Sequence, residues 1–148
     1  LLIVDLLPGT GYAQLSLVQA THVSGAIIVT TPQEMAVGDA LRGAKMFERV
    51  GVPLIGVVEN MSAFVDPESG RRFELFSSGG GARLSAEIGA PLLGTVPLQP
   101  GLAEQADRGS PILVAEPQSP AAVNLRAIAE DLQQKTARPG VSLPILRG

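Results

Sequence analysis

One carboxylate, Asp5, stands where an apolar run ends and a turn begins. Residues 1–4 precede it as Leu-Leu-Ile-Val, and the turn segment Leu6-Leu7-Pro8-Gly9-Thr10-Gly11 follows. An aspartate at the carboxyl end of a buried strand can hold magnesium, and a nearby glycine lets backbone N–H groups approach a phosphate closely. The pattern therefore predicts a site for magnesium and phosphate. The alternative is the edge of a buried strand with an ordinary Pro-Gly turn.

Four continuous apolar runs predict the strands that would position such a site. They cover residues 1–6, 26–29, 54–58 and 92–96, and their lack of alternation indicates burial on both faces. Helical patterns separate the runs, so we expect an α/β fold with a parallel sheet between two helical layers. Ligands of such sheets bind at the carboxyl ends of the strands. The residues at these ends are Asp5, Thr30-Thr31-Pro32, Glu59-Asn60 and Pro97-Leu98.

Three helices are expected between and after the later strands. The first follows Thr31-Pro32-Gln33-Glu34, which has the form of a capping box with proline at the first helical position, and Gly51 ends it. The second covers residues 82–88 and is entered through three glycines. The third follows Ser119-Pro120. Its apolar stripe consists of Leu125, Ile128, Ala129 and Leu132.

The stretch of residues 61–78 is too long for a simple connection between a strand and a helix. It contains the turn sequence Asp66-Pro67-Glu68-Ser69-Gly70, followed by alternation in Phe73-Glu74-Leu75. This chemistry predicts a two-stranded hairpin. Long excursions of this kind are often functional.

Composition and charge limit the classes of function. The chain has 148 residues, 45% of them apolar, which suits one domain with a substantial core. A formal charge of −3 without a run of basic residues argues against a nucleic-acid surface, and no apolar stretch has membrane-spanning length. The absence of cysteine excludes disulfides and thiolate metal ligands within this chain. We therefore expect a cytoplasmic protein that binds neither nucleic acid nor membrane.

The two ends of the chain suggest how it is organised. It begins inside an expected strand without an initiator Met, which predicts that residues 1–137 are the carboxyl-terminal part of a single larger domain. Residues 138–148 contain two prolines, Pro139 and Pro144, and read as an extended or disordered tail.

Six motifs follow one another along nearly the whole chain. They are Leu2-Ile3-Val4-Asp5-Leu6-Leu7-Pro8-Gly9-Thr10-Gly11, Ile28-Val29-Thr30-Thr31-Pro32-Gln33, Gly56-Val57-Val58-Glu59-Asn60-Met61-Ser62, Phe76-Ser77-Ser78-Gly79-Gly80-Gly81, Leu93-Gly94-Thr95-Val96-Pro97-Leu98 and Ser119-Pro120-Ala121-Ala122. Together they resemble the carboxyl-terminal part of the Mrp/ApbC family of P-loop ATPases that carry iron-sulfur clusters. The resemblance implies a three-layer P-loop NTPase fold. It also implies a homodimer that binds and hydrolyses ATP and assembles or transfers clusters to client apoproteins.

The resemblance also implies roles for residues near the phosphates. Asp5 would match the family's magnesium-associated aspartate, acting through a water, and Gly9, after Pro8, would match the switch glycine that faces the terminal phosphate. ATP and magnesium would be the cofactors. Asp5 and Gly9 would then be the residues most directly involved in hydrolysis.

A second group of residues would contact the nucleotide base. Asn60 would match the asparagine that hydrogen-bonds adenine, and its amide offers the donor and acceptor that the base edge requires. Pro97 and Leu98 would form the loop whose backbone flanks the base. An alternative role for Asn60 is that of a cap or turn residue at the end of a strand.

Four departures from the family pattern leave other functions open. Leu7 replaces a proline, Tyr12 replaces an aspartate, and no segment matches the phosphate loop G-x-x-x-x-G-K-[ST]. Asp66 and Ser69 stand where typical members have a Cys-x-x-Cys pair. This chain alone is therefore expected to lack ATPase activity and to hold no stable cluster, although the full-length protein could carry one.

Two rival functions follow from these departures. One is a nucleotide-dependent regulatory switch or partner protein without a cluster. The other, a MinD-like or ParA-like positioning ATPase, is disfavoured because prolines interrupt any amphipathic tail and basic patches are missing.

Overall fold

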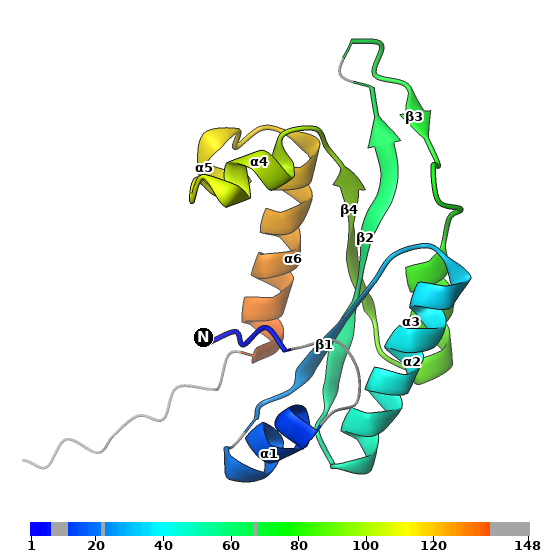
Figure 1. Cartoon of the computed structure of the whole chain (residues 1–148), viewed down its shortest axis with the longest axis vertical. Helices are drawn as coiled ribbons and strands as arrows, with labels where there is room; N and C mark the ends of the chain where they lie inside the picture. Colours follow the sequence, from blue (N-terminus) through cyan, green and yellow to red (C-terminus); the bar gives the residue numbers. More distant parts are fainter. Residues whose placement is uncertain (7–11, 22, 67, 137–148) are drawn as a thin grey trace, which may run out of the picture.

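The computed structural model describes residues 1–6, 12–21, 23–66 and 68–136 of the chain. Helices and strands alternate along this part (Figure 1). The elements are α1 (Tyr12–Ala20), β1 (Ala26–Thr30), α2 (Glu34–Arg49), β2 (Leu54–Val65), β3 (Arg72–Phe73), α3 (Gly80–Ile88), β4 (Leu92–Leu98), α4 (Leu102–Asp107), α5 (Ile112–Ala115) and α6 (Pro120–Thr136).

The long strand β2 is the centre of the sheet. Strands β1 and β4 pair with it in parallel, one on each side, and β3 pairs antiparallel with its far end. The register places Thr30 beside Glu59 and Asn60 beside Val96. The carboxyl ends of the three parallel strands therefore meet at one edge, as expected from the sequence.

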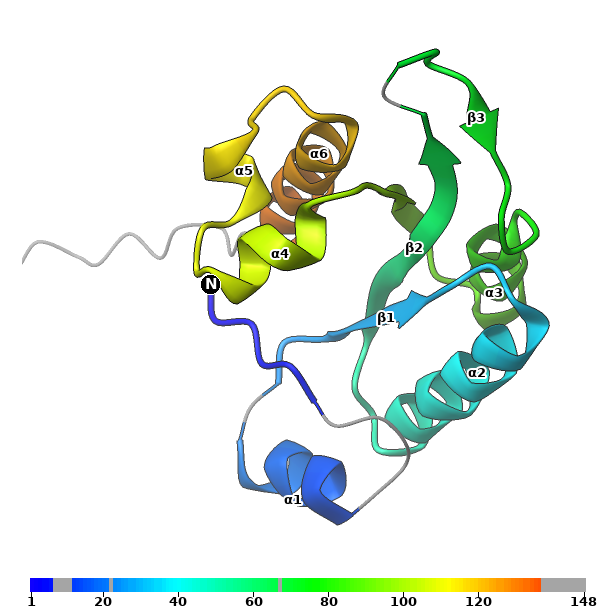
Figure 2. The same cartoon turned by 45° about the horizontal axis from the view of Figure 1, so that its top comes forward.

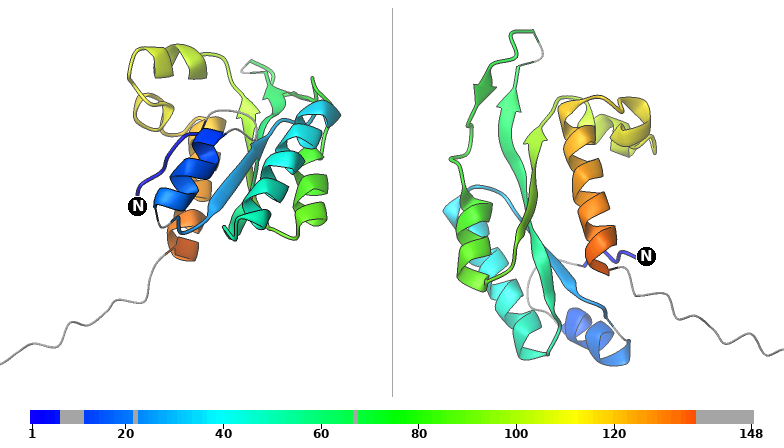
Figure 3. Two further views of the ribbon diagram at one scale, coloured as in Figure 1. Left: turned by 60° about the horizontal axis from the view of Figure 1, so that its bottom comes forward. Right: turned by 180° about the vertical axis from the view of Figure 1, so that it is seen from behind.

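Helices cover both faces of this sheet. Figure 3 shows α2 and α3 on one face and α6 on the other. Two neighbouring residues of β2 illustrate the layering, since Val57 packs in a cluster with Ile28, Ala44 and Leu84, whereas Val58 packs in another with Val96 and α6 residues. Successive side chains of a strand point to opposite faces, so one strand contributes to both cores. The three-layer α/β architecture is thus confirmed.

The predicted strand over residues 1–6 is wrong. This segment forms no strand, and the side chains of its first four residues are between 53% and 85% exposed. A strand needs the N–H and C=O groups of a neighbour. Within the described residues no strand pairs with this segment, so its apolar composition alone does not produce the predicted structure.

The start of α2 also differs from the expectation. The helix begins at Glu34 with Gln33 as its N-cap, and Gln33 is extended (ψ 141°) and makes no side-chain capping bond. The capping box that was predicted from Thr31 therefore does not form. The reason is tertiary, because Pro32 is fully buried and its backbone packs directly against Gly80. This contact keeps the chain extended until Gln33.

The other predicted helices are confirmed with changed limits. Gly51, with φ +75°, follows the end of α2, and α3 begins two residues earlier than expected, after Gly79 with φ +69°. Helix α6 buries Ile128 and Leu132, but Ala129 is exposed and does not belong to the buried stripe. Helices α1, α4 and α5 were not predicted.

The predicted hairpin is confirmed, and its first strand is longer than the apolar run in the sequence indicated. Strand β2 continues to Val65 and pairs Phe64 with Phe73 of β3. Figure 2 shows that β3 and the end of β2 project beyond the helical layers. We call residues 61–78 the arm.

Candidate functional site

The register of β2 and β4 brings together three of the residues predicted to bind the base. Asn60 pairs with Val96, the residue before Pro97, and Phe64 pairs with Leu98. Asn60 and the Pro97-Leu98 segment therefore lie at the same edge of the sheet, although they are far apart in sequence. The strand ends predicted this juxtaposition correctly.

A bulge separates these two pairings. Four residue steps on β2, from Asn60 to Phe64, match two steps on β4, from Val96 to Leu98. Pro97 has no N–H and cannot donate to a strand ladder, and such prolines occur at bulges. The extra residues lie in β2. The buried hydroxyl of Ser62 donates to the carbonyl oxygen of Val96 at 3.3 Å and so attaches the bulged part of β2 to β4.

The amide of Asn60 is oriented by its own backbone. The N–H of Met61 donates to Oδ1 of Asn60 at 2.9 Å, and Asn60 is half-buried. Among the hydrogen bonds within the described residues, none uses Nδ2 of Asn60. The side chain thus offers a donor at the sheet edge, next to an oxygen that is already engaged.

A buried carboxylate at the end of the parallel part of β2 connects this edge to helix α3. Glu59 is only 4% exposed, and its Oε2 accepts a hydrogen bond from the N–H of Gly81 at 2.6 Å. Gly81 lies in the first turn of α3, where unpaired N–H groups and the helix dipole favour a negative charge. The glutamate therefore closes the base of the arm by joining β2 to the helix that follows it.

The three glycines at residues 79–81 serve close packing. A Cβ at Gly80 would lie 2.6 Å from the carbonyl oxygen of Pro32, and one at Gly81 would lie 2.7 Å from Cβ of Glu59. These glycines join the loop after β1, strand β2 and helix α3. From the sequence these glycines were expected as a helix entry and as part of one motif, and their packing against Pro32 and Glu59 was not predicted. The available signal was the acidic Glu59 at the end of an apolar strand.

Two amide side chains, also missed from the sequence, attach the Pro97-Leu98 segment to α6. Gln99 accepts a hydrogen bond from the N–H of Ala121 and donates one to Glu116, both at 3.1 Å. Asn124 donates to the carbonyl oxygen of Thr95 at 2.8 Å. The loop expected to flank the base is therefore fixed at both ends.

The tip of the arm holds Asp66 and Ser69, which the resemblance to the family places at the positions of its Cys-x-x-Cys pair. Ser69 Oγ donates to Oδ2 of Asp66 at 2.6 Å, and the N–H of Glu68 donates to Oδ1 at 2.9 Å. These bonds, that of Ser69 first, lower the pKa of Asp66. Asp66 and Ser69 thus close a turn by bonding to each other, and the structure's described portion contains no group of three His, Cys, Asp or Glu side chains suited to a metal.

Asp5 is exposed and lies in a segment without strand structure. Pro8 and Gly9 lie outside the described residues. Within the described residues no strand pairs with the segment of Asp5, so the strand end at which Asp5 was expected does not form.

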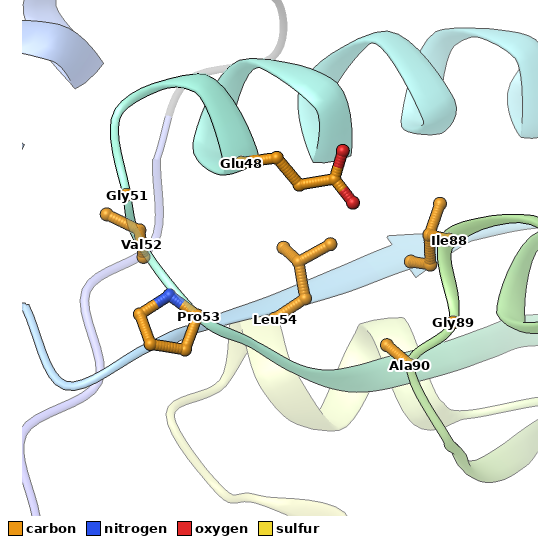
Figure 4. A pocket seen from close by; sticks show the side chains of 8 residues that line it. All are labelled: Glu48, Gly51, Val52, Pro53, Leu54, Ile88, Gly89 and Ala90. Carbon is orange, nitrogen blue, oxygen red and sulfur yellow. The ribbon is translucent and has the colours of Figure 1, made fainter.

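A hollow lies at the opposite end of the sheet (Figure 4). It has a volume of about 380 Å³ and is lined by Glu48, Gly51, Val52, Pro53, Leu54, Ile88, Gly89 and Ala90. Glu48 is its one charged side chain, and the hollow lies where β2 begins. It is therefore distinct from the predicted nucleotide edge.

No helix in the described ranges is long and apolar enough to cross a membrane.

Comparisons with known proteins agree with this architecture. A nucleotide-binding protein from Archaeoglobus fulgidus, solved in complex with ADP, superposes with a TM-score of 0.64 at 32% identity, over 78% of this chain and 46% of that one. The cell-division ATPase MinD of Pyrococcus furiosus superposes with a TM-score of 0.57 over 75% of this chain and 43% of that one. At 22% identity, MinD shows the shared P-loop NTPase fold alone.

Relatives found by sequence have a higher identity to this chain than these two solved structures. An iron-sulfur cluster carrier protein of Synechocystis is 51% identical over 137 residues, which are 92% of this chain and 39% of that protein. An iron-sulfur protein required for NADH dehydrogenase in Arabidopsis thaliana mitochondria is 45% identical over 80% of this chain and 38% of its own length. The chain thus spans about two fifths of these relatives. A model of ParA-type, NUBPL iron-transfer P-loop NTPases matches residues 1–133, and the chain belongs to that family.

Proposed function

We propose that the protein containing this chain is an ATP-dependent iron-sulfur cluster carrier. It binds ATP and magnesium, works as a homodimer in the cytoplasm, and assembles clusters or transfers them to client apoproteins. Two relatives of this chain are named iron-sulfur cluster carrier proteins, which supports an iron-sulfur cluster as the group that is carried.

The observation that carries the nucleotide part is the position of Asn60 beside Pro97-Leu98. The Nδ2 group of Asn60 donates to a ring nitrogen of adenine, and the backbone of Pro97 and Leu98 flanks the base. The hydrogen bond from Met61 to Oδ1 fixes which end of the amide is the donor. The ADP in the A. fulgidus neighbour supports an adenine nucleotide as the ligand.

Asp5, Pro8 and Gly9 form the phosphate side of the same proposal. A carboxylate such as that of Asp5 supplies the hard oxygen that magnesium prefers, and its exposure leaves it free for a hydrated ion. Bound magnesium would neutralise charge on the terminal phosphates. Asp5 would orient the ion's water shell, and Gly9 would let its backbone N–H approach the terminal phosphate.

Titration of ATP and GTP against the full-length protein tests the base assignment. We expect a clear preference for ATP. Asn60→Ala should weaken ATP binding by about 1–3 kcal/mol, the penalty for an unpaired polar group. Asn60→Asp is a second variant that keeps an oxygen able to accept from Met61 but replaces the donor with a charged acceptor, so it should lose the same preference. Equal affinities in the wild type, or an unchanged Asn60→Ala variant, would reject the assignment.

The tip of the arm favours a second candidate, a nucleotide-dependent regulatory switch without a cluster. Iron-sulfur clusters are held mostly by thiolates, and Asp66 and Ser69 are oxygen ligands already bonded to each other. A cluster carried by the full protein would need cysteines from other parts of it or from a client. Anaerobic reconstitution with iron and sulfide, followed by absorption spectroscopy and iron counting, distinguishes the two: no cluster on the full-length protein favours the switch.

A further inference from the structure

Met61 has an unusual backbone conformation directly after Asn60. Its φ is +53°, in the left-handed region that residues other than glycine rarely adopt. Its side chain is 38% exposed, so burial in a core does not compensate for this conformation. Conformations of this kind persist where the surroundings enforce them, and they cluster at ligand sites.

The bulge in β2 explains why Met61 is held in this conformation. Asn60 is fixed by its pairing with Val96 on one side, and Phe64 is fixed by its pairing with Leu98 on the other. The bond from Ser62 to the Val96 carbonyl holds the segment between them against β4. The extra residues opposite Pro97 must therefore be taken up by a turn of the backbone, and this turn occurs at Met61.

The turn has a consequence for the amide of Asn60. In a regular strand the N–H of Met61 would point toward a neighbouring strand. This N–H belongs to the peptide plane between Asn60 and Met61, and a rotation of that plane between two fixed Cα atoms changes ψ of Asn60 and φ of Met61 together. With φ of Met61 at +53°, the N–H donates to Oδ1 of Asn60 at 2.9 Å instead. Reversing the amide would place Nδ2 against the Met61 N–H, donor against donor, so the orientation of the amide depends on the backbone of Met61.

We infer that Met61 is a positioning residue that sets the base preference of the nucleotide site through the orientation of Asn60. This inference rests on the proposed function, in which Asn60 contacts the base. A fixed Nδ2 donor selects a purine that presents a ring-nitrogen acceptor beside an amino group, as adenine does, and rejects one that presents a ring N–H. The backbone conformation of Met61, not its side chain, carries this selection.

Two substitutions that both remove the methionine side chain test the inference in the full-length protein. Glycine adopts positive φ readily, whereas β-branched valine does so only with strain. We expect Met61→Gly to keep the ratio of ATP to GTP affinity within about twofold of wild type and Met61→Val to lower it by about tenfold or more. Calorimetric titration of both nucleotides measures the ratio. Hydrogen exchange at the Met61 N–H should also accelerate in Met61→Val and not in Met61→Gly.

Asn60→Ala in the same assay distinguishes a failure of the base contact of Asn60 from a failure of the positioning role of Met61. If Asn60→Ala leaves the ratio unchanged, the proposed base contact is wrong. If Asn60→Ala abolishes the preference while a folded Met61→Val keeps it, only the role of Met61 is overturned. Should the valine variant fail to fold, Met61→Ala replaces it: the inference requires a lower ratio for alanine than for glycine, and equal ratios would reject it.

Discussion

The carboxylate of Glu59 accepts a hydrogen bond from the backbone N–H of Gly81 across the base of the arm. This contact connects the strand end that carries Asn60 to the first turn of α3. Because a Cβ on Gly81 would meet Glu59 and one on Gly80 would meet the Pro32 backbone, three motifs that are separate in sequence become one packed unit. The glycines therefore position the edge that carries Asn60, and the carboxylate of Glu59 occupies the helix N-terminus, where N–H groups favour a negative charge.

Gly81→Ala should destabilise the fold. The added methyl group would lie 2.7 Å from Cβ of Glu59, and overpacking of this kind costs about 1–3 kcal/mol. Gly43→Ala is the matched control, because Gly43 lies inside α2 with no atom within 4 Å of an added Cβ. That change should stabilise the helix by up to about 1 kcal/mol. Urea unfolding measures both; equal effects of the two substitutions would contradict the packing argument.

Replacement of Glu59 tests the hydrogen bond itself. Glu59→Ala leaves the Gly81 N–H buried without an acceptor and should lower the free energy of unfolding by about 1–3 kcal/mol. Glu59→Gln retains an acceptor oxygen of the same reach and should lose less, since only the charge-assisted part of the bond disappears. The free energies of unfolding of the three proteins decide this, and a glutamine variant as unstable as the alanine variant would speak against the bond.

The sequence predicted the layers well because they depend on local patterns. Apolar runs identify buried strands, and strand ends place Asn60 beside Pro97 and Leu98 since parallel strands finish at one edge. The prediction for residues 1–6 was wrong because ladder bonds come from a neighbour, not from composition. The capping box at Thr31 was wrong because Gly80, distant in sequence, packs on Pro32.

The supporting contacts of the site could not be predicted for the same reason. The bond between Glu59 and Gly81 and those of Gln99 join residues that no periodic pattern relates. Helix α1 was missed because its sequence, YAQLSLVQA, has neither an acidic first turn nor a basic last turn. The roles of Asp5, Pro8, Gly9, Asn60, Pro97 and Leu98 in binding remain predictions.

Ser69→Ala should change the titration of Asp66. The Ser69 hydroxyl and the Glu68 N–H hold the pKa of Asp66 below its ordinary value of about 3.9. A lowered pKa means that the ionised carboxylate stabilises the folded turn above the ordinary pKa. This stabilisation is lost as the pH falls through the lowered value. We expect the alanine variant to raise the pKa of Asp66 toward normal, as carbon-detected NMR titration of the carboxyl group can measure. An unchanged pKa would mean that the Ser69 bond is not formed in solution.

Asp5→Asn tests the phosphate side of the site, in the full-length protein. Asparagine keeps the shape of the side chain and removes the charge that would hold the hydrated magnesium ion. ATP hydrolysis should therefore fall by about 100-fold, because several kcal/mol of charge stabilisation can depend on the metal. Nucleotide affinity without magnesium should change little. Asp107→Asn, at an exposed residue that ends α4, is the charge-matched control and should hydrolyse ATP at the wild-type rate. If Asp5→Asn retains full magnesium-dependent turnover, Asp5 does not hold the ion, and the magnesium ligand must be another residue.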